Sequence, residues 1–226
     1  MRRRAILFAA AIAAFSFFYG SDTGAVNRTH AERFIGAQAT GDTGVYAFDK
    51  AHSFIGFKVR HNGLIDVPGF FRDFTGTVTY DAKDVSKSSV EFTAKVTSVD
   101  TGVAARDNHL RTKDFFEVET HPEITFKSTS VSKKGNTWTV TGNFTMKGVT
   151  KEISLPFDLT GFIPGNERSG TRMGITAKTK INRRDFGVNY GGNLPNGAPV
   201  IGNDIDIDLQ IEALIRRDPP APRPGL

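Results

Sequence analysis

The 226-residue chain contains no cysteine. This absence excludes disulfide bonds, thiolate catalysis, and zinc or iron–sulfur sites built on cysteine. The chain also lacks a Gly-x-Ser-x-Gly elbow and a phosphate-binding glycine loop, and the acidic Asp204, Asp206 and Asp208 fall on the outward phase of their strand. We therefore expect no enzymatic activity.

Long hydrophobic runs are also lacking. The N-terminal apolar run, Ala5 to Tyr19, is shorter than the about 20 residues of a transmembrane helix. It follows three arginines at positions 2–4, and this order is typical of an export signal. We predict a signal peptide over residues 1–25, with an uncleaved anchor as the alternative. The predicted location is periplasmic or secreted, a setting that a cysteine-free protein tolerates.

Neither charge nor histidine spacing indicates a nucleic-acid or metal site. The net charge is +5, and removing the signal lowers it to about +3, because three arginines and Asp22 are lost. Lysines and arginines are scattered along alternating segments, so no nucleic-acid partner is expected. His52, His61, His109 and His121 lack a His-x-His or His-Glu-x-x-His spacing, so no metal site is predicted either.

Most of the remaining chain alternates apolar and polar residues, as half-buried strands do. One apolar and one polar face on every strand indicates an antiparallel sheet around a single interior. About eight such strands can close into a barrel that is filled by side chains or holds a small ligand, and a two-sheet sandwich is the alternative. The expected strands are residues 45–61, 74–80, 90–96, 124–130, 138–146, 153–159, 173–181 and 205–211.

The segments outside this pattern set the expected organisation. Residues 101–116 crowd charges ahead of two phenylalanines and predict one or two helical turns over a barrel end. Residues 26–41 are expected to be a flexible spacer, residues 42–214 a single all-β domain, and residues 215–226 a Pro-rich disordered tail. The Gly/Pro-rich loop 187–200 is the best candidate for a mobile lid.

Several motifs resemble the signatures of the YceI-like family, in the same order along the chain. The matching segments are Asp49 to Gly63, Val67-Pro-Gly-Phe70, Phe74-Thr-Gly76, Arg106 to Phe116, His121 to Ser128, Gly142 to Lys151 and Ile181 to Gly187. The resemblance covers about residues 44–213. It implies an exported lipocalin-like antiparallel β-barrel that is not an enzyme and is often a dimer. Its apolar tunnel would bind a polyisoprenoid, an isoprenoid quinone or a similar long-chain amphiphile.

A tunnel for a long apolar chain would be lined by the inward side chains of the strands. Periodicity alone favours a filled core, whereas the family resemblance favours a ligand. His61 is included because it shares the inward phase of its strand. The candidate lining residues are Ile55, Phe57, Val59, His61, Val78, Tyr80, Phe92, Val96, Phe126, Trp138, Val140, Phe144, Phe157, Leu159, Met173 and Ile175.

Polar candidates for a head-group or rim site are Arg106, His109, Arg111, Arg183 and Asn189. A guanidinium group suits the oxygens of a phosphate or a quinone. The alternative is that the arginines and neighbouring aspartates cap one another and tie the loop to the barrel rim.

The predicted function is to sequester or carry such a lipid, with no other cofactor expected. The partners would be a long-chain isoprenoid or fatty amphiphile, a membrane contacted transiently, and a second copy in a homodimer. Two alternatives remain open. One is an accessory protein that presents a bound quinone to a redox partner, and the other is a filled-core structural or stress barrel without ligand.

Overall fold

The structure is a computed structural model that describes residues 40–135, 137–166 and 169–215. The predicted signal peptide, nearly all of the spacer and the Pro-rich tail from residue 216 lie outside the described residues. The elements are β1 (Gly44–Phe48), β2 (Phe54–His61), β3 (Ile65–Phe71), β4 (Phe74–Tyr80), η1 (Val85–Lys87), β5 (Ser89–Lys95), η2 (Val96–Ser98), β6 (Val99–Asp100), α1 (Ala104–Arg111), β7 (Glu123–Lys134), β8 (Thr137–Met146), β9 (Val149–Ile163), β10 (Arg172–Asn182), η3 (Arg183–Phe186) and β11 (Ile201–Ile215), where η marks a 3-10 helix.

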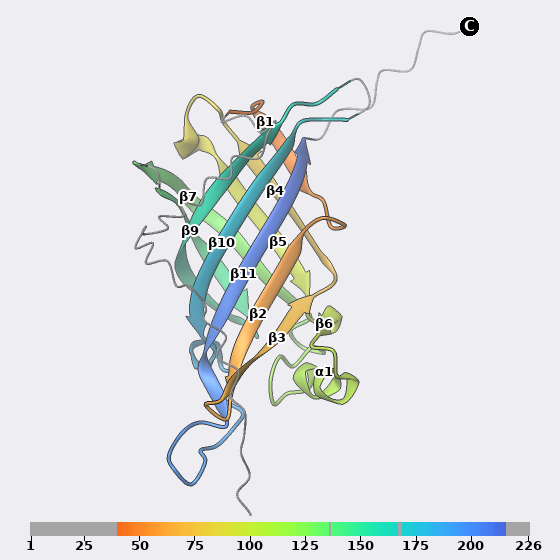
Figure 1. Ribbon diagram of the computed structural model, residues 1–226, viewed down its shortest axis with the longest axis vertical. Helices are drawn as coiled ribbons and strands as arrows, with labels where there is room; N and C mark the ends of the chain where they lie inside the picture. The colour runs from red at the N-terminus through yellow and green to blue at the C-terminus, as the bar shows by residue number, and fades with distance from the viewer. Residues whose placement is uncertain (1–39, 136, 167–168, 216–226) are drawn as a thin grey trace, which may run out of the picture. The chain divides into compact units, whose positions relative to one another are not determined.

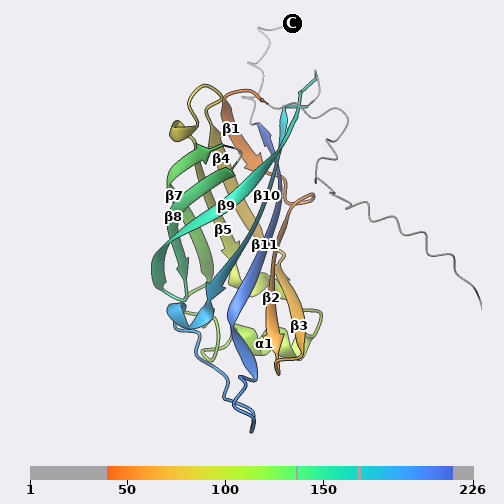
Figure 2. The same ribbon diagram turned by 60° about the vertical axis from the view of Figure 1, so that its left-hand side comes forward.

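Strand pairing closes the predicted antiparallel barrel (Figures 1 and 2). The order β1-β4-β5-β7-β8-β9-β10-β11 returns to its start because β11 also pairs with β1, which gives eight strands around the interior. The strands β2, β3 and β6 follow β11 in the hydrogen-bonding order of the same sheet. This closure confirms the barrel prediction and rules out the sandwich alternative.

One position of the barrel wall is built from two shorter strands. β11 pairs through Ala213–Ile215 with β1 and through Ile201–Gln210 with β2, so β1 and β2 are two halves of one bent strand. The prediction of a single strand over 45–61 was therefore wrong at residues 49–53, where the chain turns. β3 was missed altogether, because Pro68 and the adjacent Phe70 and Phe71 break the alternation of apolar and polar residues.

Two tight turns fix the register of neighbouring strands. At the β2–β3 turn Asn62 has φ 51° and Gly63 has φ 70°, and at the β8–β9 turn Lys147 has φ 48° and Gly148 has φ 73°. Positive φ at both central positions matches the right-handed twist of a hairpin, and Asn-Gly is the pair that adopts it most readily. These two turns thereby set which side chains of β2, β3, β8 and β9 point inward.

The single α-helix of the described residues, α1, lies within the predicted 101–116 segment and confirms that prediction. It lies at the same end of the barrel as the β2–β3 turn, and β1 lies at the opposite end (Figures 1 and 2). Among the described residues, no helix is both long and apolar enough to cross a membrane.

Aromatic side chains fill the β1 end of the barrel. Tyr46 is fully buried and lies edge-on to Tyr80, with 6.4 Å between ring centroids, and 6.2 Å from Phe162. Its hydroxyl donates a 2.7 Å hydrogen bond to the carbonyl oxygen of Asp42. Burial, with a smaller effect of Asp42, raises the pKa of Tyr46 to about 12. Tyr46 and Phe162 thus fill the part of the interior next to β1.

Candidate functional site

Two cavities lie in the barrel interior. The α1-end cavity has a volume of about 130 Å³, and its lining includes Leu110, Phe115 and Phe116 from the α1 segment and Val188 from the loop after η3. The β1-end cavity has a volume of about 100 Å³ and extends toward Phe48 and Tyr80. Both are lined almost entirely by hydrocarbon and aromatic side chains, because every strand turns its apolar phase inward.

Four side chains line both cavities and form a waist between them. The waist consists of Ile55, Phe92, Leu155 and Leu209. A protein cavity of about 150 Å³ holds one benzene molecule, so each of these spaces takes about six carbons as it stands. The two cavities with their waist define the tunnel. A chain longer than about six carbons has to pass between the waist side chains to reach the second cavity.

Most of the predicted lining residues do lie at these cavities. Four of them, Ile55, Phe57, Val59 and Phe144, line the α1-end cavity, and Ile55 also lines the other one. Phe92 lines both cavities. The remaining predicted residues that line the β1-end cavity are Val78, Tyr80, Phe126, Trp138, Val140, Phe157, Leu159, Met173 and Ile175.

Two predicted lining residues lie elsewhere. His61 has the inward phase of β2 but stands at its last position, beside the Asn62-Gly63 turn, where it is exposed and lines neither cavity. Val96 is only 1% exposed, but it begins η2, and the tighter helical turn places it in the packed core away from the cavities. The alternation of inward and outward side chains therefore misplaces residues at or just beyond the end of a strand.

The candidate list also omitted lining residues. Leu155, Ile181, Ile207 and Leu209 belong to alternating strands, so the same period-two signal could have found them. Leu110, Phe115 and Phe116 come from the non-alternating segment, and no periodic pattern marks them as lining residues.

Most of the polar rim candidates hold the α1 segment in place. The guanidinium of Arg111 donates hydrogen bonds of 2.9 Å to the carbonyl oxygens of Thr97 and Val99. Arg106 donates at 2.7 Å to both the hydroxyl and the carbonyl oxygen of Thr101. Neither arginine lines a cavity. Arg111 ties the loop to its neighbours as the alternative expected, but both arginines bind oxygens of threonine and valine and not the neighbouring aspartates.

His109 joins the α1 segment to the loop after η3. Its Nε2 lies 2.8 Å from a carboxylate oxygen of Asp114. Its ring packs edge-on against Phe115 and Tyr190, with centroid distances of 5.1 Å and 4.8 Å. The rim candidate Asn189 is exposed and lines neither cavity. This contact joins two segments that both contribute side chains to the lining of the α1-end cavity.

Arg183 is the rim candidate that does line the tunnel. It is 3% exposed and follows β10 directly, as the first residue of η3. Burial, with a smaller effect of the neighbouring Arg184, lowers the pKa of Arg183. A guanidinium remains charged at neutral pH even so, but no polar atom is exposed to the α1-end cavity, so only the aliphatic part of Arg183 faces it. The guanidinium donates instead to the carbonyl oxygens of Val188, Ile201 and Gly202.

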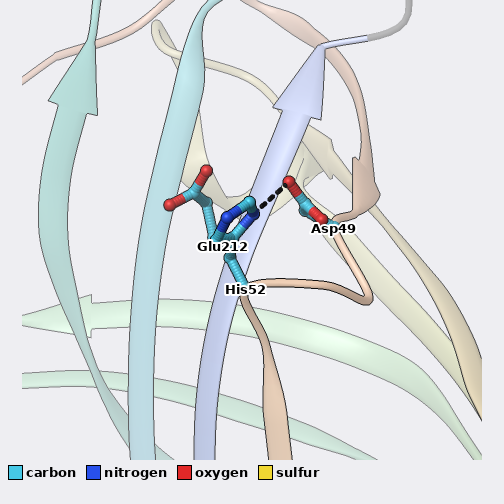
Figure 3. A group of neighbouring side chains, drawn as sticks. All are labelled: Asp49, His52 and Glu212. Carbon is cyan, nitrogen blue, oxygen red and sulfur yellow. Dashed lines mark hydrogen bonds and ion pairs between the residues drawn. The ribbon is translucent and has the colours of Figure 1, made fainter.

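A second polar cluster lies outside the tunnel, where β1 passes into β2 (Figure 3). Asp49, His52 and Glu212 bring one ligand atom each to within 4.8 Å of one another. The Nδ1 atom of His52 lies 2.8 Å from Asp49, and this hydrogen bond lowers the pKa of Asp49 and raises that of His52. Arg172 also contacts Glu212 and lies 3.7 Å from Asp49.

A divalent cation at this cluster would have to compete with the Arg172 guanidinium for the same two carboxylates. The hydrogen bonds there instead join the chain turn to β11. Ser53 accepts from the Glu212 amide at 3.0 Å, and its hydroxyl donates to the Glu212 carbonyl oxygen at 3.1 Å. The cluster thus stabilises the bend between the two halves of the split strand.

Residues 46–213 match the sequence profile of the YceI-like domain. A UPF0312 protein of Photorhabdus laumondii is 43% identical over 136 residues, which are 60% of this chain and 70% of the relative. Protein YceI of Salmonella arizonae is 42% identical over 146 residues, which are 63% of this chain and 75% of the relative. The similarity therefore extends over most of the described barrel.

Solved structures share the same barrel. The YceI protein of Campylobacter jejuni has a TM-score of 0.59 and 29% identity, and the match covers 75% of this chain and 96% of that one. BcnA of Burkholderia cenocepacia has a TM-score of 0.63 at 22% identity, with 73% and 98% covered. A polyisoprenoid binding domain from Saccharophagus degradans has a TM-score of 0.54 at 15% identity, with 76% and 98% covered. At such low identity the last two show the fold alone.

Proposed function

The chain belongs to the YceI-like family, and from this premise we propose that it binds a long-chain isoprenoid lipid in its tunnel and sequesters or carries it. The observation that carries the proposal is the pair of apolar cavities in series, joined at the waist. Each methylene buried there contributes about 0.8 kcal/mol. Burial of the lipid tail therefore suffices for strong binding, and no covalent step is needed.

A structural neighbour supports the choice of lipid. The Saccharophagus degradans domain that shares the barrel is described as polyisoprenoid binding. The dominance of branched and aromatic side chains along the tunnel suits a methyl-branched chain. Among the residues that line the two cavities, none is a carboxylate or a histidine that could transfer protons. A binding role thus accounts for the lining better than a catalytic one.

Location and partners are part of the same proposal. The arginine-led apolar N-terminus supports export to the periplasm or the cell exterior. A water-insoluble ligand would have to be collected from a membrane. Leu64 and Ile65, at the β2–β3 turn beside the α1 end of the barrel, are 76% and 62% exposed. We propose that these two side chains touch the membrane transiently during loading. The expected homodimer stays a prediction, which size-exclusion chromatography with light scattering would test.

Solvent extraction of the purified protein followed by mass spectrometry tests the binding function. An isoprenoid lipid at near-equal molar amount supports carriage. A redox-active quinone supports the second candidate, an accessory protein that presents a quinone to a redox partner. If the extract is empty and an uncharged fluorescent probe such as N-phenyl-1-naphthylamine is not taken up, the filled-core alternative replaces both.

A further inference from the structure

Three aromatic side chains close the β1 end of the tunnel. Tyr80 lines the β1-end cavity, and the ring centroids of Phe162 and Tyr46 lie 5.1 Å and 6.4 Å from that of Tyr80. Neither Phe162 nor Tyr46 lines a cavity, so these two rings form a second layer behind Tyr80. Together, Tyr46, Tyr80 and Phe162 form an aromatic plug.

The chain that precedes β1 supports the aromatic plug from outside. The Tyr46 hydroxyl donates to the carbonyl oxygen of Asp42, and the Thr171 hydroxyl donates to the carboxylate of the same residue. The backbone of Gly41 lies so close to the Phe162 ring that a Cβ atom there would come within 2.1 Å of it. Phe162 and Tyr46, with 1% and 0% of their surface exposed, are therefore held between the interior and this backbone.

The waist is a weaker obstacle than the aromatic plug. Three of its four side chains, Ile55, Leu155 and Leu209, are aliphatic and have a cavity on either side. Each can therefore change rotamer into free space when a chain passes. The rings of Phe162 and Tyr46 have backbone behind them instead, and displacing them would disrupt close packing and a buried hydrogen bond. A tail that passes the waist thus ends at Tyr80.

We propose that the aromatic plug sets the maximum length of the lipid tail, and that Tyr80 is the residue that the end of the tail contacts. The cavities of about 130 Å³ and 100 Å³ together hold about twelve carbons, and a bound tail also occupies the waist between them. The ligand class is consequently an isoprenoid of about three units, such as a farnesyl chain. This inference rests on the proposed lipid-binding function and adds to it the tail length and the residue that limits it.

Alcohols of increasing tail length test the inference on the unaltered protein. Prenol, geraniol, farnesol and geranylgeraniol differ by one isoprene unit each, and displacement of N-phenyl-1-naphthylamine from delipidated protein gives each dissociation constant. Affinity should rise with each unit up to farnesol. Geranylgeraniol should bind within about threefold of farnesol, because its extra unit stays in water outside the tunnel. A larger gain at geranylgeraniol would overturn the inference while leaving lipid binding intact.

Two variants should change the length limit in opposite directions. Tyr80→Ala removes a ring of about benzene size, which leaves room for about one isoprene unit, so geranylgeraniol should then bind at least about tenfold more tightly than farnesol. Val78 lies directly opposite Tyr46 and lines the β1-end cavity. Val78→Phe therefore adds bulk beside the aromatic plug, and farnesol should then bind no more tightly than geraniol. Tyr80→Phe is the matched control, because it keeps the ring, and its length dependence should equal that of the wild type.

Circular dichroism establishes that each variant is folded. An unchanged length dependence in folded Tyr80→Ala would refute the assignment to Tyr80. If that variant does not fold, Val78→Phe decides, since a core usually tolerates overpacking of this kind, and an unaltered preference for farnesol over geraniol would refute the inference. Failure of all four alcohols and the probe to bind the wild type would instead refute the proposed function itself.

Discussion

Replacement of Leu155 by tryptophan is expected to divide the tunnel at its waist. Leu155 is buried, projects inward from β9 and lines both cavities. An indole ring at this position occupies the space through which a lipid tail passes. Overpacking of this kind typically costs about 1–3 kcal/mol, so the barrel should remain folded, and the nearly volume-conserving Leu155→Met is the matched control.

The expected magnitude follows from the carbon count. One isoprene unit beyond the waist buries about five carbons, which contribute up to about 4 kcal/mol at about 0.8 kcal/mol each. This is a difference of up to about a thousandfold in the dissociation constant. In the wild type, affinity should rise steeply from prenol to geraniol, which carry one and two isoprene units. In Leu155→Trp most of that rise should disappear, since the second unit no longer reaches the β1-end cavity.

Probe displacement with prenol, geraniol and farnesol measures this chain-length dependence directly. Circular dichroism and thermal unfolding of each variant establish that the barrel is intact. If folded Leu155→Trp shows the same gain per isoprene unit as wild type and Leu155→Met, then the two cavities are not filled in series by one chain, and the tunnel interpretation is wrong.

Three further outcomes are expected. Phe144→Trp and Val140→Trp, each confined to one cavity, should reduce lipid occupancy in extracts while costing only about 1–3 kcal/mol of stability; unchanged occupancy would place both side chains outside the lipid path. Leu64→Ser combined with Ile65→Thr should slow transfer of lipid from vesicles severalfold without changing equilibrium affinity, and an unaltered transfer rate would argue against membrane contact there. Because burial raises the pKa of Tyr46 to about 12 in the folded state, against about 10 in an unfolded chain, its contribution to stability is present below pH 10 and is lost as the pH rises toward 12. Denaturant unfolding across this range should show a steeper loss in wild type than in Tyr46→Phe, and identical slopes would contradict the assignment.

The fold could be predicted from the sequence wherever apolar and polar residues alternate along a regular strand. The apolar phase of β8, which carries Trp138, Val140 and Phe144, places all three side chains at the tunnel. The rule failed where the backbone departs from a regular strand, as at the turn between β1 and β2 and at Val96 in η2. Where a strand bends or ends depends on its pairing with strands that are distant in sequence, and the local pattern of residues carries no information about that pairing.

The polar site was less predictable for a different reason. Arg106, Arg111 and Arg183 belong to the same residue type in similar charged surroundings, yet only Arg183 lines the tunnel. The difference comes from the carbonyl groups that each guanidinium meets after folding, and these belong to loops whose path has no periodic signal. Residue type suggested which side chains could bind a head group, whereas the fold decided which of them lies beside the tunnel.

The double pairing of β11 has a consequence for how the chain acquires its structure. The contact between Tyr46 and Ile215 that closes the wall joins the first and last strands of the domain, and contacts so distant in sequence form late because of the entropy of closing a long loop. A nascent or translocating chain therefore has no sealed interior until its final strand emerges. Under the export proposed above, the barrel would close and meet its ligand only after translocation.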